Sequence, residues 1–476
     1  MISIVLILPI IFCIVAFLNK NNKLNNILTI FYSVIHFLLS LCFFFKENFV
    51  GNNEYFSLNS TNIIFYSILS IVFLMVALYN KSYAKNLEKT FDNKKIMHYY
   101  TMLLIFVFSM TGGILSNNLG LAWIFIEGTT LATAYLIYFN KTKHSIEAAW
   151  KYVFICSIGI ALAFVGIILL TIATGNLNSL NYADLLKNAP NFSHFWMNVS
   201  FVFILFGIGT KMGLAPVHFW LPDAHAEAPS PISALLSATL LNCAFLIIFN
   251  VYKIMIAGNC IAFPRTMLIV MGFMSLFITS VFVYHTTNYK RMLAYSSIEN
   301  MGILAIATSL GGIAYYALIL HLIGHSLIKA SFFLTSGNIL ELFETKKVKS
   351  IRSIVSYDGK TAWLWIVSFL GICAFPPSVL FISEFLIVKT FIIQKHYILC
   401  ALFLFLLTVI LFGIGRTILK MSFGEKNPEK DELVKNNLSK LTISNYLPQY
   451  ILLTLAFVLG LYVPRFLKNI IDNMVN

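Results

Sequence analysis

The sequence is poor in charged residues. Of its 476 residues, only 11% are Asp, Glu, Lys or Arg, while 59% are hydrophobic. Soluble globular domains are about a quarter charged and about half apolar. The shortage of charge therefore excludes an ordinary soluble protein and predicts an all-α membrane protein. The net charge of +14 does not indicate nucleic-acid binding, because membrane proteins collect Lys and Arg in their cytoplasmic loops.

The sequence also lacks the motifs of metal, redox and nucleotide chemistry. The seven cysteines stand singly in apolar runs, at Cys13, Cys42, Cys156, Cys243, Cys260, Cys373 and Cys400. Without CxxC or Cys/His spacing, no iron–sulfur, haem or zinc centre is predicted. Walker, dinucleotide and nucleophile-elbow motifs are absent too, which disfavours ATP-driven pumping and hydrolase chemistry. We expect no catalytic or redox centre in this chain.

Long apolar runs are what the sequence has instead. About twenty apolar residues span a bilayer as a helix, and about fourteen such runs can be marked. They cover residues 2–18, 26–45, 62–80, 99–116, 119–139, 150–174, 200–225, 231–256, 265–287, 290–309, 314–340, 361–395, 398–421 and 448–467. The first run lacks a basic leader and a cleavage site, so we expect a retained helix there.

Lys and Arg are distributed unequally among the connections. They concentrate after odd-numbered runs, for example within 81–95 and 346–352. The positive-inside bias predicts that these loops are cytoplasmic and that both termini lie outside.

Two five-helix units can be laid side by side. In each unit, proline interrupts the fourth run, which also carries an ionisable residue: Lys211 precedes Pro216, and Glu384 follows Pro376–Pro377. Five is odd, so the second unit is inverted, and matching helix breaks in inverted halves indicate a transport site. The alternative is two coincidental kinks in a helical anchor. The predicted parts are 1–98 (three helices), 99–256 (first unit), 265–421 (second unit) and 422–476 (charged loop and last helix).

Glu127 lies in the apolar run LAWIFIEGTTLATAYLIYF, with no other charge nearby in sequence. A charge at the bilayer centre costs about 2.5–3.5 kcal/mol, so intramembrane ionisable residues are candidates for function. Burial would favour the neutral form of Glu127, whereas a neighbouring ammonium would hold it ionised. We predict that Lys211 is that neighbour. The alternative is a protonated glutamate packed alone in the bundle.

The stretch HLIGHSLIKASFF places three titratable residues on one helical face. His321, His325 and Lys329 are spaced i, i+4 and i+8. No carboxylate or thiolate accompanies them on that face, which disfavours a metal site. Histidine titrates near neutral pH, so these three residues, the titratable file, suit a proton relay. The alternative for each histidine is a hydrogen-bonded core residue.

Other polar residues leave two interpretations open. Glu299, beside Tyr295–Ser297, is a second intramembrane carboxylate and a candidate for the same path. Lys151 is a candidate relay residue or an interfacial lysine whose ammonium reaches the membrane surface.

Asp223, His225 and Glu227 resemble a metal-ligand cluster. We expect a hairpin and helix-capping role for those three, because their connection is rich in proline.

Several stretches resemble the antiporter-like, proton-translocating subunits shared by respiratory complex I, Mrp-type cation/proton antiporters and membrane-bound hydrogenases. They are WIFIEGTTLATA, EAAWKYVFIC, GTKMGLAPVHFWLPDAHAEAPSPISALLSATLLNCA, LAYSSIENMG and HSLIKASFFLTSGN. The similarity runs from about residue 99 to 421 and is greatest to the component F branch of hydrogenase-4, a formate hydrogenlyase-type complex. It implies fourteen transmembrane helices, inverted repeats, broken helices 7 and 12, and a prokaryotic cytoplasmic (inner) membrane.

The resemblance also implies which residues carry protons: Glu127, Lys211, His321, His325, Lys329 and Glu384. Two positions depart from the family pattern. Asn242 stands where many relatives have lysine, and Ser237 where some have histidine. The connection between the halves is then expected to depend on the eleventh helix, on Glu299 or on water.

The implied partners are other membrane subunits and a peripheral redox arm that holds the [NiFe] and iron–sulfur centres. The chain would then be a non-catalytic subunit of an oxidoreductase complex of the hydrogenase or NADH:quinone oxidoreductase type. Two alternatives remain at this point: a subunit of a multisubunit cation/proton antiporter, and the membrane partner of a bicarbonate uptake system.

Overall fold

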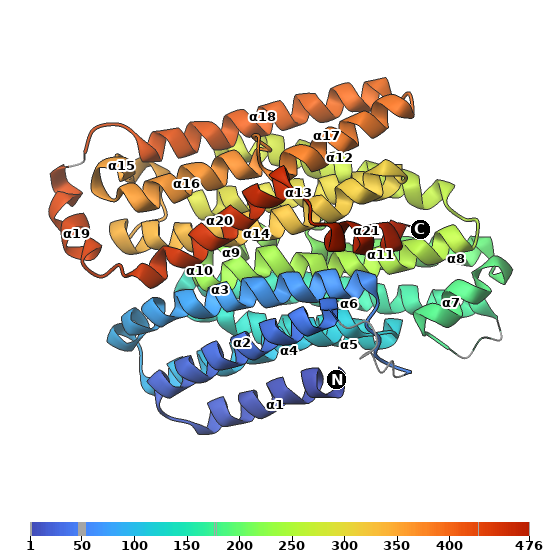
Figure 1. Cartoon of the computed structure of the whole chain (residues 1–476), viewed down its shortest axis with the longest axis horizontal. Coiled ribbons are helices and arrows are strands. Elements are labelled where there is room, and N and C mark those ends of the chain that lie inside the picture. Colours follow the sequence, from blue (N-terminus) through green and yellow to red (C-terminus); the bar gives the residue numbers. More distant parts are fainter. Residues whose placement is uncertain (1, 46–53, 176, 178, 427, 476) are drawn as a thin grey trace.

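The computed structural model describes residues 2–45, 54–175, 177, 179–426 and 428–475. Within them the chain is nearly all helical, with no strand beyond isolated bridges such as Phe56–Ser116. The helices run roughly along one direction, which is the long axis of Figure 1. This arrangement agrees with the predicted all-α membrane protein.

The first half of the chain begins with three helices that precede the predicted units: α1 (Ile2–Leu18), α2 (Asn22–Phe45) and α3 (Ser60–Thr90). The next helices are α4 (Asn93–Leu115), α5 (Leu119–Tyr138), α6 (Lys143–Thr174), α7 (Tyr182–Asn188), α8 (His194–Met212), α9 (Leu221–Glu227), α10 (Ser230–Leu235), the π-helical η3 (Leu236–Leu240) and α11 (Leu241–Ala257).

The second half contains α12 (Ala262–His285), α13 (Tyr289–Leu310), α14 (Ile313–Phe343), α15 (Ile354–Tyr357), α16 (Gly359–Ile372), α17 (Val379–Ile393) and α18 (Tyr397–Ser422). The chain continues through α19 (Pro428–Leu438), α20 (Leu447–Leu461) and α21 (Arg465–Val475). The stretch Gly424–Lys440, at the start of the predicted part 422–476, is predicted to be a charged loop, but most of it forms α19. Helix-forming Glu, Lys and Leu and the i,i+4 pair Asp431–Lys435 (2.6 Å) account for it.

Eleven helices within the described ranges are long and apolar enough to cross a membrane. The three predicted spans outside that set have identifiable features. Helix α1 is shorter, α13 carries many polar residues, and α16 and α17 are the two pieces of a broken helix. The count of fourteen therefore stays a prediction.

Two long segments form the centre of the bundle. Ser230–Ala257 and Ile313–Phe343 are enclosed by other helices, whereas α6 and α18 expose large apolar side chains such as Phe154 and Phe405. The order of packing is alike in the two predicted units: α4, α5, α6 and α8 contact one another in succession, as do α12, α13, α14 and the α16–α17 pair. Because Ile313–Phe343 is enclosed, the polar residues of α14 are held away from the outer surface.

Both proline interruptions break a helix, as predicted. Helix α8 ends at Met212, where Gly213 has φ +78°, a left-handed conformation that suits glycine. Helix α16 ends at Ile372, before Pro376–Pro377. Both breaks contain a cis X–Pro bond, Ala215–Pro216 and Pro376–Pro377.

Side chains satisfy the backbone groups that the two breaks release. The indole Nε1 of Trp220 donates to the Thr210 carbonyl (2.7 Å), and Ser275 Oγ accepts from the Ala215 amide (2.9 Å). At the second break, Ser378 Oγ donates to the Gly371 carbonyl (3.1 Å). Irregular backbone inside a membrane protein needs such partners, so both breaks are built parts of the fold.

Candidate functional site

Lys211 occupies the last turn of α8, immediately before the break, and is fully buried. Its Nζ donates to the Tyr152 hydroxyl (2.8 Å) and lies 4.6 Å from the centroid of that ring. Close packing of α6 on α8 fixes this geometry, since a Cβ at Gly207 would lie 2.4 Å from the Ala163 nitrogen. The ammonium therefore hydrogen-bonds to a phenol on α6.

The direct Glu127–Lys211 ion pair that we predicted is not formed in this structure. Glu127 on α5 is only half-buried, and its carboxylate accepts from Thr130 Oγ1 (3.0 Å). No carboxylate of the described residues lies within 4.0 Å of the Lys211 ammonium. The sequence could not reveal this, because the position of Tyr152 opposite Lys211 is set by packing between helices.

A series of polar contacts connects the two residues instead. The Thr133 hydroxyl hydrogen-bonds with that of Tyr152 and contacts the Thr130 carbonyl at 3.4 Å. Thr130 and Thr133 lie on the same α5 face as Glu127, one turn apart. The contacts thus lead from Lys211 through two hydroxyls to the Thr130 backbone, and the Thr130 hydroxyl continues to Glu127. The repeated Thr in EGTTLAT is the one signal that could have indicated them.

The three residues of the α14 file are all fully buried, as their shared face predicted. His321 uses both ring nitrogens, at 3.0 Å from Ser383 Oγ on α17 and 3.1 Å from Asn300 Oδ1 on α13. His325 Nε2 donates to a backbone carbonyl (3.3 Å), and its Nδ1 has no hydrogen-bond partner among the described residues. Lys329 Nζ donates to the Leu293 carbonyl (2.9 Å).

The π-helical η3 segment joins α14 to α13 near the centre of the bundle. The carbonyl that His325 contacts belongs to Ser237, and the Ser237 hydroxyl hydrogen-bonds with that of Ser297 on α13 (2.8 Å). Asn242 donates to Ser326 Oγ (2.6 Å). Both residues that depart from the family pattern thus face α13 or α14. Helical segments of π type often occur at functional sites.

Glu299 and Glu384 line one cavity of about 310 Å³. Glu299 on α13 is buried and accepts from Ser296 Oγ (3.2 Å), while Glu384 on α17 is half-buried. Most other lining residues are apolar, among them Phe381, Phe403 and Leu407. The cavity is large enough for several waters, each needing about 30 Å³, and it places the two carboxyl groups beside the same space.

Lys151 lies at the end of the bundle that carries the basic loops. It pairs with Glu147 (2.6 Å) and Asp223 (3.1 Å) and is 46% exposed. Arg291 also pairs with Asp223. A half-exposed, doubly paired lysine fits the interfacial alternative better than a relay inside the bundle.

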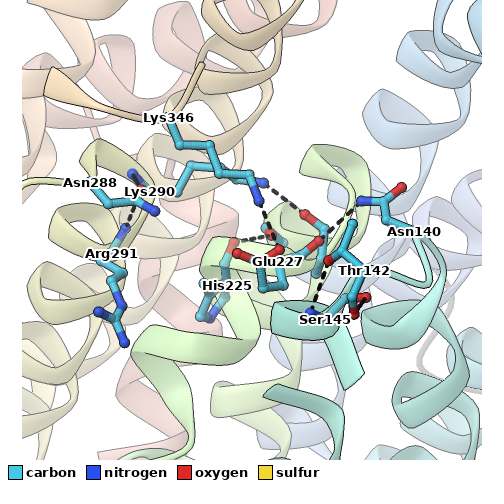
Figure 2. A network of polar contacts seen from close by, with 11 residues as sticks. Asn140, Thr142, Ser145, His225, Glu227, Asn288, Lys290, Arg291 and Lys346 are labelled. Atoms are coloured by element: carbon cyan, nitrogen blue, oxygen red, sulfur yellow. Dashed lines mark hydrogen bonds and ion pairs between the residues drawn. The ribbon is translucent and has the colours of Figure 1, made fainter. Parts of the chain in front are cut away.

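Asp223, His225 and Glu227 all lie on α9, the short helix after the first break. The predicted capping role is wrong, because Trp220 occupies the N-cap position of α9 and both carboxylates form ion pairs. The predicted hairpin stays a prediction. Glu227 pairs with Lys346 at 3.0 Å (Figure 2). In the described part of the chain, no three His, Cys, Asp or Glu side chains are grouped so that they could hold a metal ion.

Comparisons with known proteins agree with this architecture. The sequence family described as "NADH:quinone oxidoreductase/Mrp antiporter, TM" matches residues 116–410. A hydrogenase-4 component F homolog of Methylacidiphilum infernorum is 36% identical over 377 residues, covering 77% of this chain and 76% of that protein. Na(+)/H(+) antiporter subunit A1 of Staphylococcus epidermidis is 28% identical over 411 residues. That match covers 80% of this chain but only half of the antiporter subunit.

Two solved structures share the fold over the whole chain. A chain of the membrane-bound sulfane sulfur reductase, an archaeal respiratory membrane complex, superposes with a TM-score of 0.88 at 21% identity. A chain of the Mrp complex from Dietzia sp. superposes with a TM-score of 0.85 at 15% identity. Each match covers 100% of this chain and 96% of the other.

Proposed function

The chain belongs to the NADH:quinone oxidoreductase/Mrp antiporter family of membrane proteins, and from this premise we propose that it translocates protons within a redox-driven complex. Its partners are other membrane subunits and a peripheral arm of the hydrogenase type. The [NiFe] and iron–sulfur centres belong to that arm, and this chain supplies the proton path.

The observation that carries the proposal is a set of fully buried titratable side chains with no carboxylate of the described residues within 4.0 Å. Lys211 donates to a phenol and Lys329 to a backbone carbonyl. Neither amine is therefore held as half of a permanent ion pair, and each is free to exchange a proton with its neighbours. Burying such groups at membrane depth is costly and is typical of ion pathways.

The proposed path has two parts that meet near the π segment. In the first unit, protons move between Glu127 and Lys211 through the hydroxyls of Thr130, Thr133 and Tyr152, with water bridging the Thr130 and Thr133 hydroxyls. In the second unit, they move along His321, His325 and Lys329, in their order on α14, to the cavity that holds Glu299 and Glu384. Ser237 and Ser297 lie where the two parts approach each other.

Energy for this transport has to come from outside the chain. Moving one charge against 100 mV requires about 2.3 kcal/mol. Electron transfer in the peripheral arm would supply it by shifting the bundle between conformations that favour different protonation states.

The proposed location is a prokaryotic inner membrane, with the basic loops in the cytoplasm and both termini outside. Figure 1 supports the topology, since the two termini lie at the same end of the bundle, opposite α15 and α19. The positive-inside bias then gives the direction.

A cation/proton antiporter subunit is the second candidate. The similarity to antiporter subunit A1 and the two carboxyl groups at one cavity favour it. Carboxylate oxygens are suitable ligands for hard cations.

Reconstitution of the complex with its native partners tests the function. We expect electron transfer to acidify or alkalinise the vesicle interior in a way that a protonophore abolishes, without uptake of ²²Na⁺. Electron transfer with no proton movement would contradict the proposal, and stoichiometric ²²Na⁺ exchange would favour the antiporter.

A further inference from the structure

The second helix break lies directly against α20. Gly460, the next-to-last residue of α20, faces the backbone of the break. A Cβ atom at this position would meet the Pro377 carbonyl oxygen first and would lie 2.6 Å from both the Ser378 carbonyl carbon and the Val379 nitrogen. Small residues let two backbones approach this closely inside a membrane protein. Figure 1 shows the end of α20 beside the junction of α16 and α17.

Helix α20 itself ends at this contact. Leu461 is its last residue, Tyr462 has an extended backbone, and Pro464 immediately precedes α21. Proline has no backbone donor, and its ring clashes with a preceding helical turn, so α20 does not continue through this point. Two interrupted helices therefore meet at Gly460.

Helix α14 contacts the same start of α17. A Cβ atom at Gly324 would lie 2.5 Å from Val379 Cγ1 and 2.9 Å from Leu380 Cδ2. Gly324 lies between His321 and His325 in the sequence of α14. The first residues of α17 are thus packed against glycines of two other helices. Close packing of this kind leaves a backbone little room to shift.

The position of α17 matters because two of its residues face the proposed path. Ser383 Oγ lies 3.0 Å from His321 Nδ1 in the titratable file, and Glu384 lines the cavity that it shares with Glu299. Both residues lie within two helical turns of Val379, the first residue of α17. A displacement of the break would therefore move both side chains relative to the file and the cavity.

We propose that Gly460 is a positioning residue for proton transfer in the second unit. Because it has no side chain, the backbone of the break lies against α20, and α17 is held where Ser383 contacts His321 and Glu384 faces the cavity. Gly324 does the same from α14. Neither glycine exchanges a proton, and each acts through the placement of α17. The inference rests on the proposed function and gives α20, which lies outside both five-helix units, a part in it.

Gly460→Ala adds one methyl group at the contact, and Gly359→Ala is the matched control. Gly359 is the first residue of α16, and a Cβ atom there has nothing within 4 Å. In the complete complex reconstituted with its partners, we expect Gly460→Ala to slow proton transfer about tenfold or more, because a misplacement of about 1 Å can cost about a hundredfold. We expect the control to keep the wild-type rate. Wild-type transfer in Gly460→Ala overturns the proposal.

A second background separates positioning from general damage. Ser383→Ala combined with Glu384→Gln removes both groups that α17 places. If Gly460 acts through them, Gly460→Ala should slow this background by no more than about twofold, because substitutions that share one cause are not additive. Equal losses with and without the two groups would indicate general damage and overturn the proposal. Absence of proton transfer in the wild type would contradict the proposed function itself.

Gly324→Ala tests the contact from α14 and does not depend on assembly of the Gly460 variant. The added methyl group would meet a side-chain atom of Val379, so Val379→Ala in the same chain makes room for it. We expect Gly324→Ala to slow proton transfer about tenfold and the double variant to recover most of the rate. Copurification with the partner subunits checks assembly. An unchanged rate in Gly324→Ala, or no recovery in the double variant, contradicts the proposal.

Discussion

The two helix breaks belong to regions that carry titratable groups in different ways. In the first, Lys211 precedes the break and donates to the Tyr152 hydroxyl, which the Thr133 hydroxyl also contacts. In the second, Glu384 follows the break and faces a cavity of about 310 Å³ that it shares with Glu299. The first region relies on direct side-chain contacts, whereas the second offers room for water. Similar backbone breaks can therefore serve different kinds of proton path.

The largest effect is expected from Lys329→Ala, which removes the amine at the centre of the second region. Its ammonium donates to the Leu293 backbone carbonyl and has no carboxylate of the described residues within 4.0 Å, although Glu299 interacts with it electrostatically. We expect the proton-transfer rate to fall at least about 100-fold, while electron transfer in the partner arm persists. Dye-monitored proton movement in proteoliposomes measures it. A fully active variant would show that the second region is not on the path.

Glu384→Gln and Glu127→Gln compare the carboxylates of the two regions directly. We expect a loss of about tenfold or more for Glu384→Gln, because it faces the cavity with only Glu299 as a second carboxyl group. Glu127→Gln should cost less, because Lys211 is bound to Tyr152 and not to Glu127. Initial rates of proton transfer at matched electron flux decide this, and the reverse order would contradict the contrast between the two regions.

Tyr152→Phe tests the hydroxyl series of the first region. The substitution keeps the ring, which packs on Trp220 at a centroid distance of 4.9 Å, and removes the hydroxyl that Lys211 and Thr133 contact. Losing one hydrogen bond is worth about 1 kcal/mol, which corresponds to about a fivefold slower rate. Thr171→Val, at an exposed threonine of the same helix that bonds only its own backbone, is the control. Equal rates in the two variants would mean that protons bypass Tyr152.

The smallest effect is expected at Asn242. Its amide donates to Ser326 Oγ and to the Ala238 carbonyl and has no proton to exchange at neutral pH. Asn242→Ala should lower thermal stability by about 1 kcal/mol and leave proton transfer nearly unchanged. Thermal unfolding and transport assays on the same preparation test both parts. A large loss of transport would place the connection between the regions at Asn242 and not at Ser237 and His325.

Much of the architecture could be predicted from the sequence. Local chemistry is visible in the sequence, and three features depend on it. They are the apolar runs of bilayer length, the prolines at 216 and 376–377, and the i, i+4, i+8 spacing of His321, His325 and Lys329. The length of α6 was less visible. It begins at Lys143, seven residues before the predicted span, because its polar first turns lie outside the apolar run.

The contacts that define the candidate site could not be predicted in the same way. Three of these features depend on how two or three helices pack. They are Tyr152 opposite Lys211, Ser237 opposite Ser297, and the ring of His225, which has no hydrogen-bond partner among the described residues. Hydropathy and spacing describe one helix at a time. The direct Glu127–Lys211 ion pair is the simplest prediction from two isolated charges. In the structure, Lys211 contacts the Tyr152 hydroxyl and Glu127 contacts the Thr130 hydroxyl instead.

Lys211→Ala in the reconstituted complex is the most direct test that buried titratable groups carry the transported proton. Lys143→Ala, at an exposed lysine of α6, is the matched control. We expect Lys211→Ala to abolish proton transfer while electron transfer by the partner arm continues at least in part, and we expect the control to behave as wild type. Undiminished proton transfer in Lys211→Ala would contradict this expectation.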